Sequence, residues 1–267
     1  MKALKNLFLR LHKTVFRYNR YLLVELTRAS FKVHDYNSAL GLSWSLISPC
    51  LIFLVLYIIF NIHFSQSMRF YPLYLLLGVI VTNFFVTAPS YMLRVFYDNR
   101  EIVLNSTIPR EYLILSGMAI HLYKFLIEMG IIWIVSIFCG LFKFSSFLLF
   151  FPLLALYVGM VLGICFALAS FYCLIRDVEH MWMMFSRLFF FVTPVFYTLE
   201  GIRPLARAMV YWLNPLTPFL VSFRELIIGT TAPDMLVYGH SVLLGLLFFF
   251  LGYGAFIFFE DAAMENA

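Results

Sequence analysis

The residues most able to do chemistry in this chain are charges that fall inside long apolar stretches. Lys124 and Glu128 lie four residues apart in one such stretch, and Arg187 lies in another. Charge inside a membrane is costly, so it usually faces a partner, a polar pathway or a substrate. Lys124 and Glu128 share a helical face and can neutralise each other, either inside a conduit or with Lys124 reaching back to the membrane surface. For Arg187 we expect a position lining a pathway or contacting an anionic substrate group.

Sequence patterns of common enzymes are missing. The chain has no G-x-x-x-x-G-K-[ST] phosphate loop and no H-E-x-x-H metal motif. His63 and His121 have no acidic residue at a spacing that would pair with them, and the four cysteines lack C-x-x-C spacing. We therefore predict no catalytic residue, no metal site and no cofactor bound by this chain.

Composition indicates where these charges sit. Apolar residues make up 63% of the 267 residues and charged residues only 12%, with a mean hydropathy of +0.91. This composition is typical of a polytopic integral membrane protein. We predict a single all-α membrane domain over residues 1–267, and nothing in the composition suggests a nucleic-acid partner.

One apolar stretch near the C-terminus is broken. Only 16 uncharged residues separate Arg207 from Arg224, fewer than the ~17 to 25 of a spanning helix, and Pro215 and Pro218 lie in their middle. This pattern predicts two short helices that dip into the membrane and return. Irregular backbone at that depth needs cover from protein or from a water-filled cavity, so we expect Asn214 and both prolines beside a pathway.

Aromatic residues surround this broken stretch, including Phe190, Tyr197, Trp212 and Phe219. Flat rings with polar tips are suitable stacking surfaces for sugars. A belt of aromatic residues at the membrane surface has the same composition, so the pattern alone leaves both interpretations open.

The remaining chain divides into a basic amphipathic helix and long apolar segments. Residues 2–32 alternate apolar and basic positions at helical spacing, which favours a helix lying in an anionic membrane surface. Six transmembrane helices are expected at 43–64, 70–93, 112–142, 144–175, 181–197 and 235–259, with the two re-entrant helices within 198–234. The segment 144–175 has 32 uncharged residues, roughly 48 Å as a helix, so we expect it to tilt, protrude or break near Pro152.

The distribution of lysine and arginine predicts the orientation. With the N-terminus in the cytoplasm, twelve basic residues fall on the cytoplasmic side and five on the outer side. Positive charge concentrates on the cytoplasmic side of membrane proteins. Both termini are therefore expected inside, as is the loop 94–111, whose mixture of charges and apolar residues suits either a docking helix or a solvated loop.

Four segments in order along the chain resemble a known family. SALGLSWSLISP (38–49) resembles its L-G-x-x-W-x-x-x-x-P approach to the first span, and IPREYLILS (108–116) resembles its P-R-E-x-L-x-L-S motif. Arg176-Asp177-Val178 precedes the fifth span, and TPVFY (193–197) is followed by NPLTPFLVSFR (214–224). These segments are similar to those of the permease subunits of ABC exporters for lipid-linked polysaccharides, such as O-antigen, capsule and teichoic acid.

The resemblance implies a homodimer in a bacterial inner membrane, paired with two cytoplasmic ATPase subunits that bind ATP and Mg²⁺. The implied cargo is a polysaccharide on an undecaprenyl diphosphate carrier, and the segment 198–234 would form the periplasmic gate. The residues implied to couple to the ATPase are Phe96, Tyr97, Asp98, Asn99, Arg100 and Glu101. Basic residues suited to the lipid diphosphate at the cytoplasmic entrance are Arg10, Lys13, Arg17 and Arg20. The expected channel or gate residues are Arg187, Phe190, Thr193, Pro194, Tyr197, Trp212, Asn214, Pro215, Pro218 and Phe219.

Three other functions are considered. An ABC exporter permease for another lipid or a drug differs only in its cargo. A membrane-embedded acyl or glycosyl transferase needs a cluster of histidines or acids at one membrane face, which the sequence does not show. A secondary transporter needs two similar halves with matching broken helices, whereas only one broken segment is evident.

Overall fold

We describe the protein from a computed structural model that places residues 20–35, 43–64, 70–105, 108–229 and 234–265. Within these residues the chain is helical, with no strand. The helices are α2 (Arg20–Asp35), α3 (Ser43–Phe64), α4 (Tyr71–Met92), α5 (Val95–Asp98), α6 (Arg100–Asn105), α7 (Glu111–Phe138), α8 (Phe144–Leu174), α9 (Val178–Val192), the 3₁₀ helix η1 (Leu199–Gly201), α10 (Pro204–Leu213), α11 (Leu216–Ile227) and α12 (Met235–Glu265).

Four of these helices are long and apolar enough to cross a membrane: α4, α7, α8 and residues Met235–Phe259 of α12. They contain 22, 28, 31 and 25 residues respectively, against the ~20 that a bilayer requires. The two other expected spans correspond to α3, whose shorter apolar part is Ile47–Phe60, and to the 15-residue α9. The expected count of six is thus met in part.

Local sequence explains where two helices end. The expected third span extends to residue 142, but α7 stops at Phe138 and Gly140 adopts a φ of 72°. Glycine is the residue that tolerates this left-handed conformation after a helix. The expected fifth span extends to residue 197, whereas α9 stops at Val192 because Thr193, which precedes Pro194, is extended. In contrast, α8 continues through Pro152 without a break.

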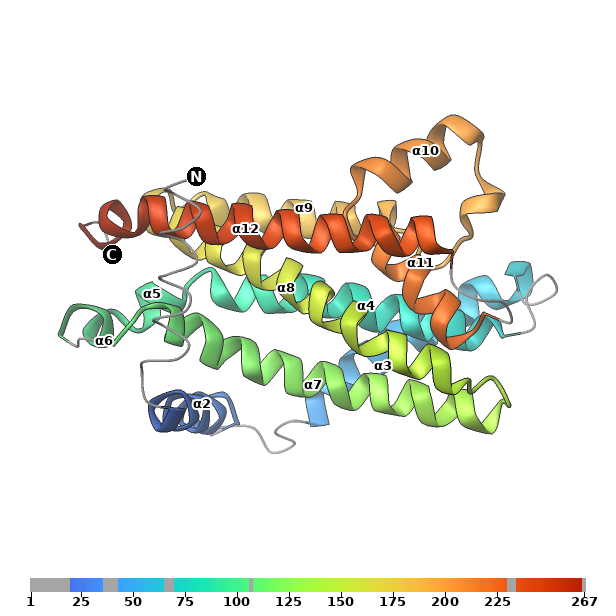
Figure 1. Cartoon of the computed structure of the whole chain (residues 1–267), viewed down its shortest axis with the longest axis horizontal. Helices are drawn as coiled ribbons and strands as arrows, with labels where there is room; N and C mark the ends of the chain where they lie inside the picture. The colour runs from blue at the N-terminus through green and yellow to red at the C-terminus, as the bar shows by residue number, and fades with distance from the viewer. Residues whose placement is uncertain (1–19, 36–42, 65–69, 106–107, 230–233, 266–267) are drawn as a thin grey trace.

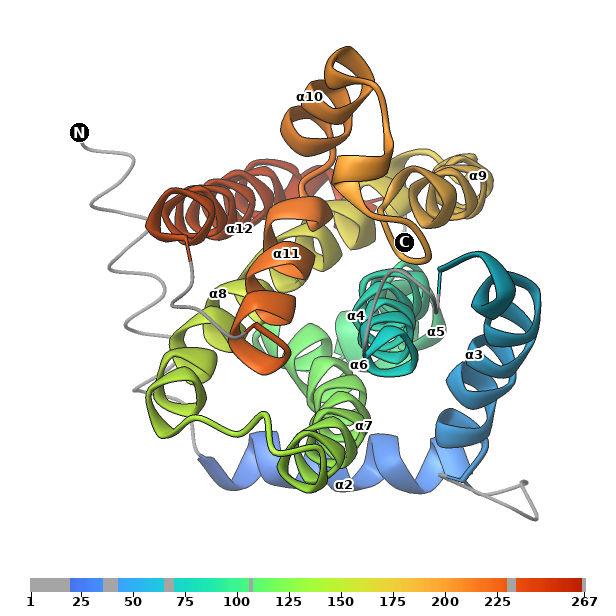
Figure 2. The same cartoon turned by 90° about the vertical axis from the view of Figure 1, so that its right-hand side faces the viewer.

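The long helices run side by side along the long axis of the molecule (Figure 1). At one end lie α2, α5, α6 and the C-terminal end of α12, and at the other lie α10, α11 and the N-terminal end of α12 (Figure 1). We call these the coupling end and the mouth end. Viewed from the mouth end, α4 occupies a central position and α2 lies across the long helices below α7 (Figure 2). The fold therefore places the loop 94–111 and the broken segment at opposite ends.

The closest helix contact joins α8 and α12 through glycines. A Cβ added to Gly163 would collide with the backbone of Phe248 and Phe249, and one added to Gly252 would collide with the backbone of Gly163. Small residues allow this approach, which is typical of membrane helix pairs. Gly159 lies one turn earlier on α8 and forms a G-x-x-x-G pattern with Gly163, but a Cβ added there would meet no atom within 4 Å.

Aromatic side chains fill the core beside this pair. Tyr157 is fully buried, donates a hydrogen bond to the Val81 carbonyl at 2.6 Å and lies against Phe84, Phe125 and Phe219. These residues come from α4, α7, α8 and α11, so one cluster joins the short helix α11 to three spanning helices. The mouth end is therefore fixed to the core through α11.

Candidate functional site

The mouth end is organised around Arg224 on α11. Its Nη1 donates to the Pro194 carbonyl at 2.6 Å, and its Nη2 donates to the carbonyls of Val195 at 2.8 Å and Tyr74 at 3.1 Å. The guanidinium also lies 3.3 Å from the ring centroid of Tyr74, and Arg224 is only 7% exposed. A planar guanidinium suits several acceptors at once and stacks on an aromatic face. Arg224 therefore joins α11 to α4 and to the turn after α9.

Gly78 makes room for this contact. A Cβ at Gly78 would lie 2.7 Å from Nη2 of Arg224 and 3.0 Å from the Val195 carbonyl oxygen. Any larger residue would press on both groups that form the hydrogen bond. This glycine is thus required by the close approach of an arginine side chain to the surface of α4.

A second polar contact closes the same turn. The Asn214 side-chain amide donates to Thr193 Oγ1 at 2.7 Å, and its carbonyl oxygen accepts from the Leu216 backbone N–H at 3.0 Å. Asn214 is 1% exposed and Thr193 is fully buried. A short amide side chain suits this turn because it bonds the backbone two residues ahead. Asn214 therefore begins α11 and holds it against the end of α9.

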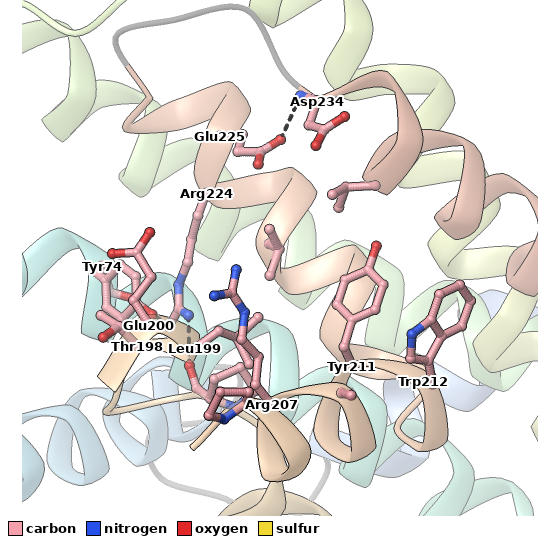
Figure 3. A pocket seen from close by; sticks show the side chains of 15 residues that line it. Tyr74, Thr198, Leu199, Glu200, Arg207, Tyr211, Trp212, Arg224, Glu225 and Asp234 are labelled. Carbon is pink, nitrogen blue, oxygen red and sulfur yellow. Dashed lines mark hydrogen bonds between the residues drawn. The ribbon is translucent and has the colours of Figure 1, made fainter. Parts of the chain in front are cut away.

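A pocket of about 580 Å³ opens between α10 and α11. Its walls carry Tyr74, Pro194, Thr198, Leu199, Glu200, Pro204, Arg207, Ala208, Tyr211, Trp212, Val221, Arg224, Glu225, Asp234 and Val237. Figure 3 shows the carboxylates of Glu225 and Asp234 along one edge, Tyr211 and Trp212 along another, and Glu200 beside Tyr74. The pocket thus combines aromatic rings with charges of both signs.

Two ionisable groups of the pocket are shifted by their surroundings. Burial raises the pKa of the Tyr211 hydroxyl, and the carboxylates of Asp234 and Glu225 act in the same direction. Burial also raises the pKa of Glu225, while a hydrogen bond from the Asp234 backbone N–H at 3.0 Å opposes that shift. Tyr211 therefore keeps its hydroxyl proton at neutral pH and can donate a hydrogen bond.

The structure brings most of the expected gate residues together, but buries half of them. Thr193, Pro194, Asn214, Pro218 and Phe219 are packed inside the protein. Phe190, Tyr197 and Pro215 are half-buried, and Trp212 and Arg187 are exposed. Pro194 and Trp212 line the pocket described above. That the ten residues line a channel stays a prediction.

Arg187 lies on the outward face of α9. It borders a shallow surface groove with His180, Met183, Met184 and Leu188. The charge of Arg187, which lies among exposed methionine and leucine side chains, would be energetically costly in contact with lipid. In the α7 stretch, Glu128 is buried and Lys124 is half-buried, so the two residues that share a helical face differ in exposure.

The expected coupling residues form two short helices at the coupling end. Phe96 is fully buried against Phe256, whereas Tyr97, Asp98, Arg100 and Glu101 are exposed. Asn99 is half-buried and separates α5 from α6, its side-chain amide donating to the Val95 carbonyl at 2.8 Å. One aromatic anchor thus holds a segment whose charged groups face outward.

An ion pair connects this segment to α9. Arg94, just ahead of α5, donates to Glu179 Oε2 from Nε at 3.0 Å and from Nη2 at 2.6 Å. Trp182, one turn further along α9, donates from its indole to Ser90 Oγ at 2.9 Å. Helix α9 ends directly before the turn at Thr193. This one helix therefore connects Arg94, just ahead of α5, with the carbonyls of Pro194 and Val195 that Arg224 binds.

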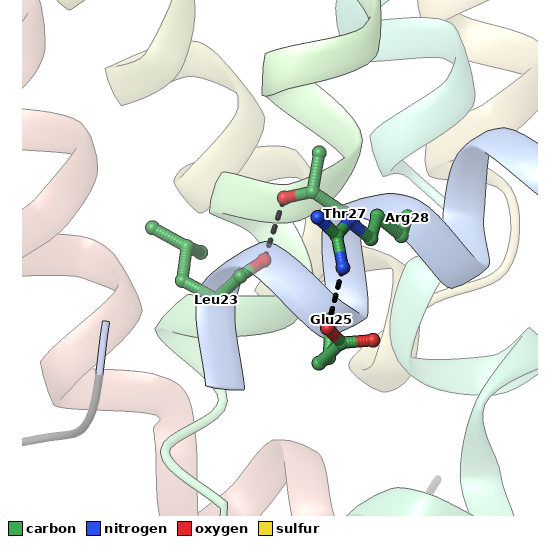
Figure 4. A network of polar contacts seen from close by, with 4 residues as sticks. All are labelled: Leu23, Glu25, Thr27 and Arg28. Carbon is green, nitrogen blue, oxygen red and sulfur yellow. Dashed lines mark hydrogen bonds and ion pairs between the residues drawn. The ribbon is translucent and has the colours of Figure 1, made fainter. Parts of the chain in front are cut away.

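The amphipathic helix expected over residues 2–32 lies only partly within the described residues, which include α2 from Arg20 onward. Arg10, Lys13 and Arg17 lie outside the described residues, and Arg20 is the first residue of α2. Phe31 packs edge-on against Tyr123 of α7, with ring centroids 5.7 Å apart. Along α2, Thr27 Oγ1 donates to the Leu23 carbonyl at 2.7 Å and Arg28 pairs with Glu25 at 2.9 Å (Figure 4).

Sequence reasoning missed the central residue of the mouth. The sequence identifies Arg224 only as the end of an uncharged run, and no pattern relates it to Tyr74, Glu200 or Asp234, which border the same pocket. The sequence signal that could have indicated this role is Arg224 itself, a charged residue at the end of an otherwise uncharged run. Within the described residues, no group of three or more histidine, cysteine or acidic side chains is placed to hold a metal ion.

Comparisons with known proteins identify the family of this chain. The chain is similar over 227 residues, at 24% identity, to the O-antigen export system permease protein RfbA of Myxococcus xanthus, covering 85% of this chain and 87% of the relative. Two proteins with the same description from Klebsiella pneumoniae are 26% and 27% identical, covering 79% and 77% of this chain and 81% and 79% of the relatives. The family model for the ABC-2 type transporter matches residues 21–228. The chain is therefore a multi-pass membrane protein that belongs to the ABC-2 type transporter family.

Proposed function

We propose that this chain is the membrane-spanning permease subunit of an ATP-driven exporter that carries O-antigen across the bacterial inner membrane. The family match and the three relatives described as O-antigen export permeases support this assignment. The observation that carries it is the separation of a coupling segment and a broken mouth segment at opposite ends of one bundle (Figure 1). An exporter must receive its energy on one side of the membrane and release its cargo on the other.

The energy source is a separate subunit. The sequence has no phosphate loop, so ATP and Mg²⁺ are bound by a cytoplasmic ATPase, two copies of which pair with the permease. The exposed charges of Asp98, Arg100 and Glu101 form the docking surface, and Phe96 holds it to the bundle. The ion pair between Arg94 and Glu179 transmits movement of that surface to α9.

The permease works as a homodimer of six-span subunits. In this arrangement α3 and α9 complete the six spans, and α10 and α11 are the re-entrant helices of the periplasmic gate. The exposed Arg187 supports a dimer, because a charge on the outward face of an apolar helix is costly in lipid. A second copy or a polar channel beside it removes that cost.

The cargo enters on its lipid carrier from the cytoplasm. Both termini lie on that side, since twelve of the basic residues fall there. Arg10, Lys13, Arg17 and Arg20 attract the diphosphate of an undecaprenyl-linked glycan, because arginine and lysine bind phosphate well. The coupling end, where α2 lies across the spanning helices, is the entrance.

The decisive experiment deletes the gene and measures the strain's own O-antigen in two places. Lipid-linked glycan is extracted from the cytoplasmic side of the membrane, and surface glycan is measured on intact cells with an antibody against the same polymer. We expect full-length polymer to accumulate inside and to disappear outside, with both restored by a plasmid copy. Unchanged surface glycan would refute O-antigen as the cargo and direct attention to another exported lipid or a drug.

A charge reversal tests the entrance. Replacing Arg17→Glu together with Arg20→Glu puts negative charge where the diphosphate is expected, so export should fall while membrane insertion and protein level are kept. The matched control reverses Arg203, an exposed basic residue at the mouth end. Equal export by the entrance variant and the wild type would contradict this entrance.

A further inference from the structure

We propose that the pocket between α10 and α11 is a binding subsite for one to three uncharged sugar units of the exported polymer. This inference rests on the proposed function and adds to it a specific site and a class of ligand. The pocket belongs to residues far apart in sequence, from Tyr74 on α4 to Val237 on α12, which no sequence motif groups together. The size and position of the pocket, the chemistry of its walls and its charge support this proposal.

The first step is size and position. A volume of about 580 Å³ lies within the ~300 to 1,000 Å³ typical of ligand pockets. The pocket opens at the mouth end, where α10 stands away from the bundle (Figures 1 and 2). None of the side chains of α10 is fully buried. The pocket is therefore open to a chain of sugars. Its α10 wall makes few packing contacts, so a ligand could displace α10 without disrupting the core.

The second step is the chemistry of the walls. Tyr211 and Trp212 lie edge to face, with ring centroids 5.5 Å apart, and both border the pocket. Glu225 and Asp234 occupy the edge next to them, and Glu200 lies across the pocket (Figure 3). A sugar ring has one apolar face and several hydroxyl groups around its edge. Aromatic side chains can stack on the apolar face of the sugar, and carboxylates can accept hydrogen bonds from its hydroxyl groups.

The third step is charge, which argues against the diphosphate carrier as the occupant. The described lining of the pocket carries three carboxyl groups and two guanidinium groups, so positive charge is not in excess there. Among the described lining residues, both terminal nitrogens of Arg224 already donate to backbone carbonyls, whereas the Arg207 side chain points into the pocket (Figure 3). An anion would therefore meet no excess of positive charge here, whereas an uncharged polyol would meet both hydrogen-bond donors and acceptors.

The buried Arg224 gives the pocket a rigid floor. Its Nε is buried and has no hydrogen-bond partner among the residues that the structure describes, whereas the other two nitrogens donate to backbone carbonyls. Unpaired buried donors are uncommon, but this nitrogen has almost no surface open to the pocket, so contacts with a ligand are left to the other lining groups. The floor is therefore built before a ligand arrives, which lowers the entropic cost of binding.

The test uses the full-length chain copurified with its ATPase in lipid nanodiscs. The probe is a trisaccharide cut from the strain's own O-antigen by mild acid, without its lipid, and inorganic diphosphate serves as the anionic comparison. Two pocket variants act by different routes: Tyr211→Ala removes a stacking surface, and Ala208→Trp fills the space. The control is Phe144→Ala, an aromatic residue that is 73% exposed and is the first residue of α8, whose N-terminal end lies at the mouth end (Figure 1).

We expect the trisaccharide to bind the wild type and the control equally, and each pocket variant at least about tenfold more weakly. Diphosphate should not compete. Wild-type protein that binds no trisaccharide, binding that persists in both pocket variants, or competition by diphosphate would each overturn the subsite. So would crosslinking of Ala208→Cys to a second copy in a background lacking the native cysteines, since the space would then be a subunit interface. The gene deletion judges the export function separately, because it does not depend on this pocket.

Discussion

Replacing Arg224 by glutamine is expected to loosen the mouth end more than any other single polar change. The substitution removes three hydrogen bonds to the carbonyls of Pro194, Val195 and Tyr74, together with the stacking on the Tyr74 ring. Glutamine is too short and too poor in donors to replace them. The carbonyls of the turn after α9 would then lose their charged partner in a buried environment.

Two bounds set the magnitude. Hydrogen bonds inside membrane proteins average ~0.6 kcal/mol, so three of them give a lower bound of about 2 kcal/mol. Hydrogen bonds to a charged donor contribute ~1.5 to 3 kcal/mol each, but Arg224 is buried without a carboxylate partner, and that desolvation offsets part of the gain. We expect a net loss of about 2 to 5 kcal/mol.

Thermal unfolding of the purified chain in one detergent measures the loss, and hydrogen exchange of the Val195 and Phe196 amides locates it. Arg203→Gln, an exposed arginine ahead of α10, is the control and should leave both readouts unchanged. Gly78→Ala should reproduce part of the effect, since its Cβ would press on Arg224 Nη2, and the two changes together should not add. Wild-type unfolding and wild-type exchange in the Arg224→Gln variant would refute the role given to this side chain.

The remaining predictions concern the rest of the bundle. Gly163→Ala should destabilise the chain by about 1 to 3 kcal/mol in thermal unfolding because its Cβ meets the backbone of α12, whereas Gly159→Ala on the same helix should not. Asn214→Ala should cost about 1 to 3 kcal/mol in the same assay, since it leaves a buried hydroxyl and a helix N–H without their partner. Glu179→Arg should reduce export per ATP hydrolysed in the assembled exporter by reversing one side of an exposed ion pair, and adding Arg94→Glu should restore it.

Each of these has a result that would count against it. Equal unfolding temperatures for the two glycine variants would mean that α8 and α12 are not in close contact. A wild-type stability for Asn214→Ala would mean that another group or water satisfies both partners. Unchanged coupling in the single charge variant, or no recovery in the double one, would show that the ion pair does not transmit movement to α9.

The broad architecture could be predicted because it follows from composition and from the length of apolar runs. A run of more than 20 apolar residues has few alternatives to a membrane helix, since every backbone polar group must be satisfied within it. Four of the expected spans are accordingly helices of sufficient length. The short helix after Pro215 also follows from local sequence. The end of α9 before Thr193 and Pro194 is not expected, since the predicted span continues to residue 197, but the restriction that proline places on the preceding residue explains it.

The site itself depended on contacts between distant residues. Arg224 and Tyr74 are 150 positions apart, and no periodicity in either segment indicates that one lies over the other. The space at Gly78 that admits the guanidinium exists only once α4 and α11 are packed. Arg94 and Glu179 are 85 positions apart, and no local pattern indicates that they form an ion pair.

By itself, the sequence determined that this is a helical membrane protein with a charged loop and a broken segment near its end, and it predicts a basic surface helix over residues 2–32. Local rules suffice for these features, because they depend on apolar length, helical period and proline. Only the tertiary structure decided that the loop and the broken segment lie at opposite ends, that half of the expected gate residues are buried, and that Arg224 holds the mouth together. Those features depend on which helix faces pack together, and packing joins residues that local sequence cannot relate.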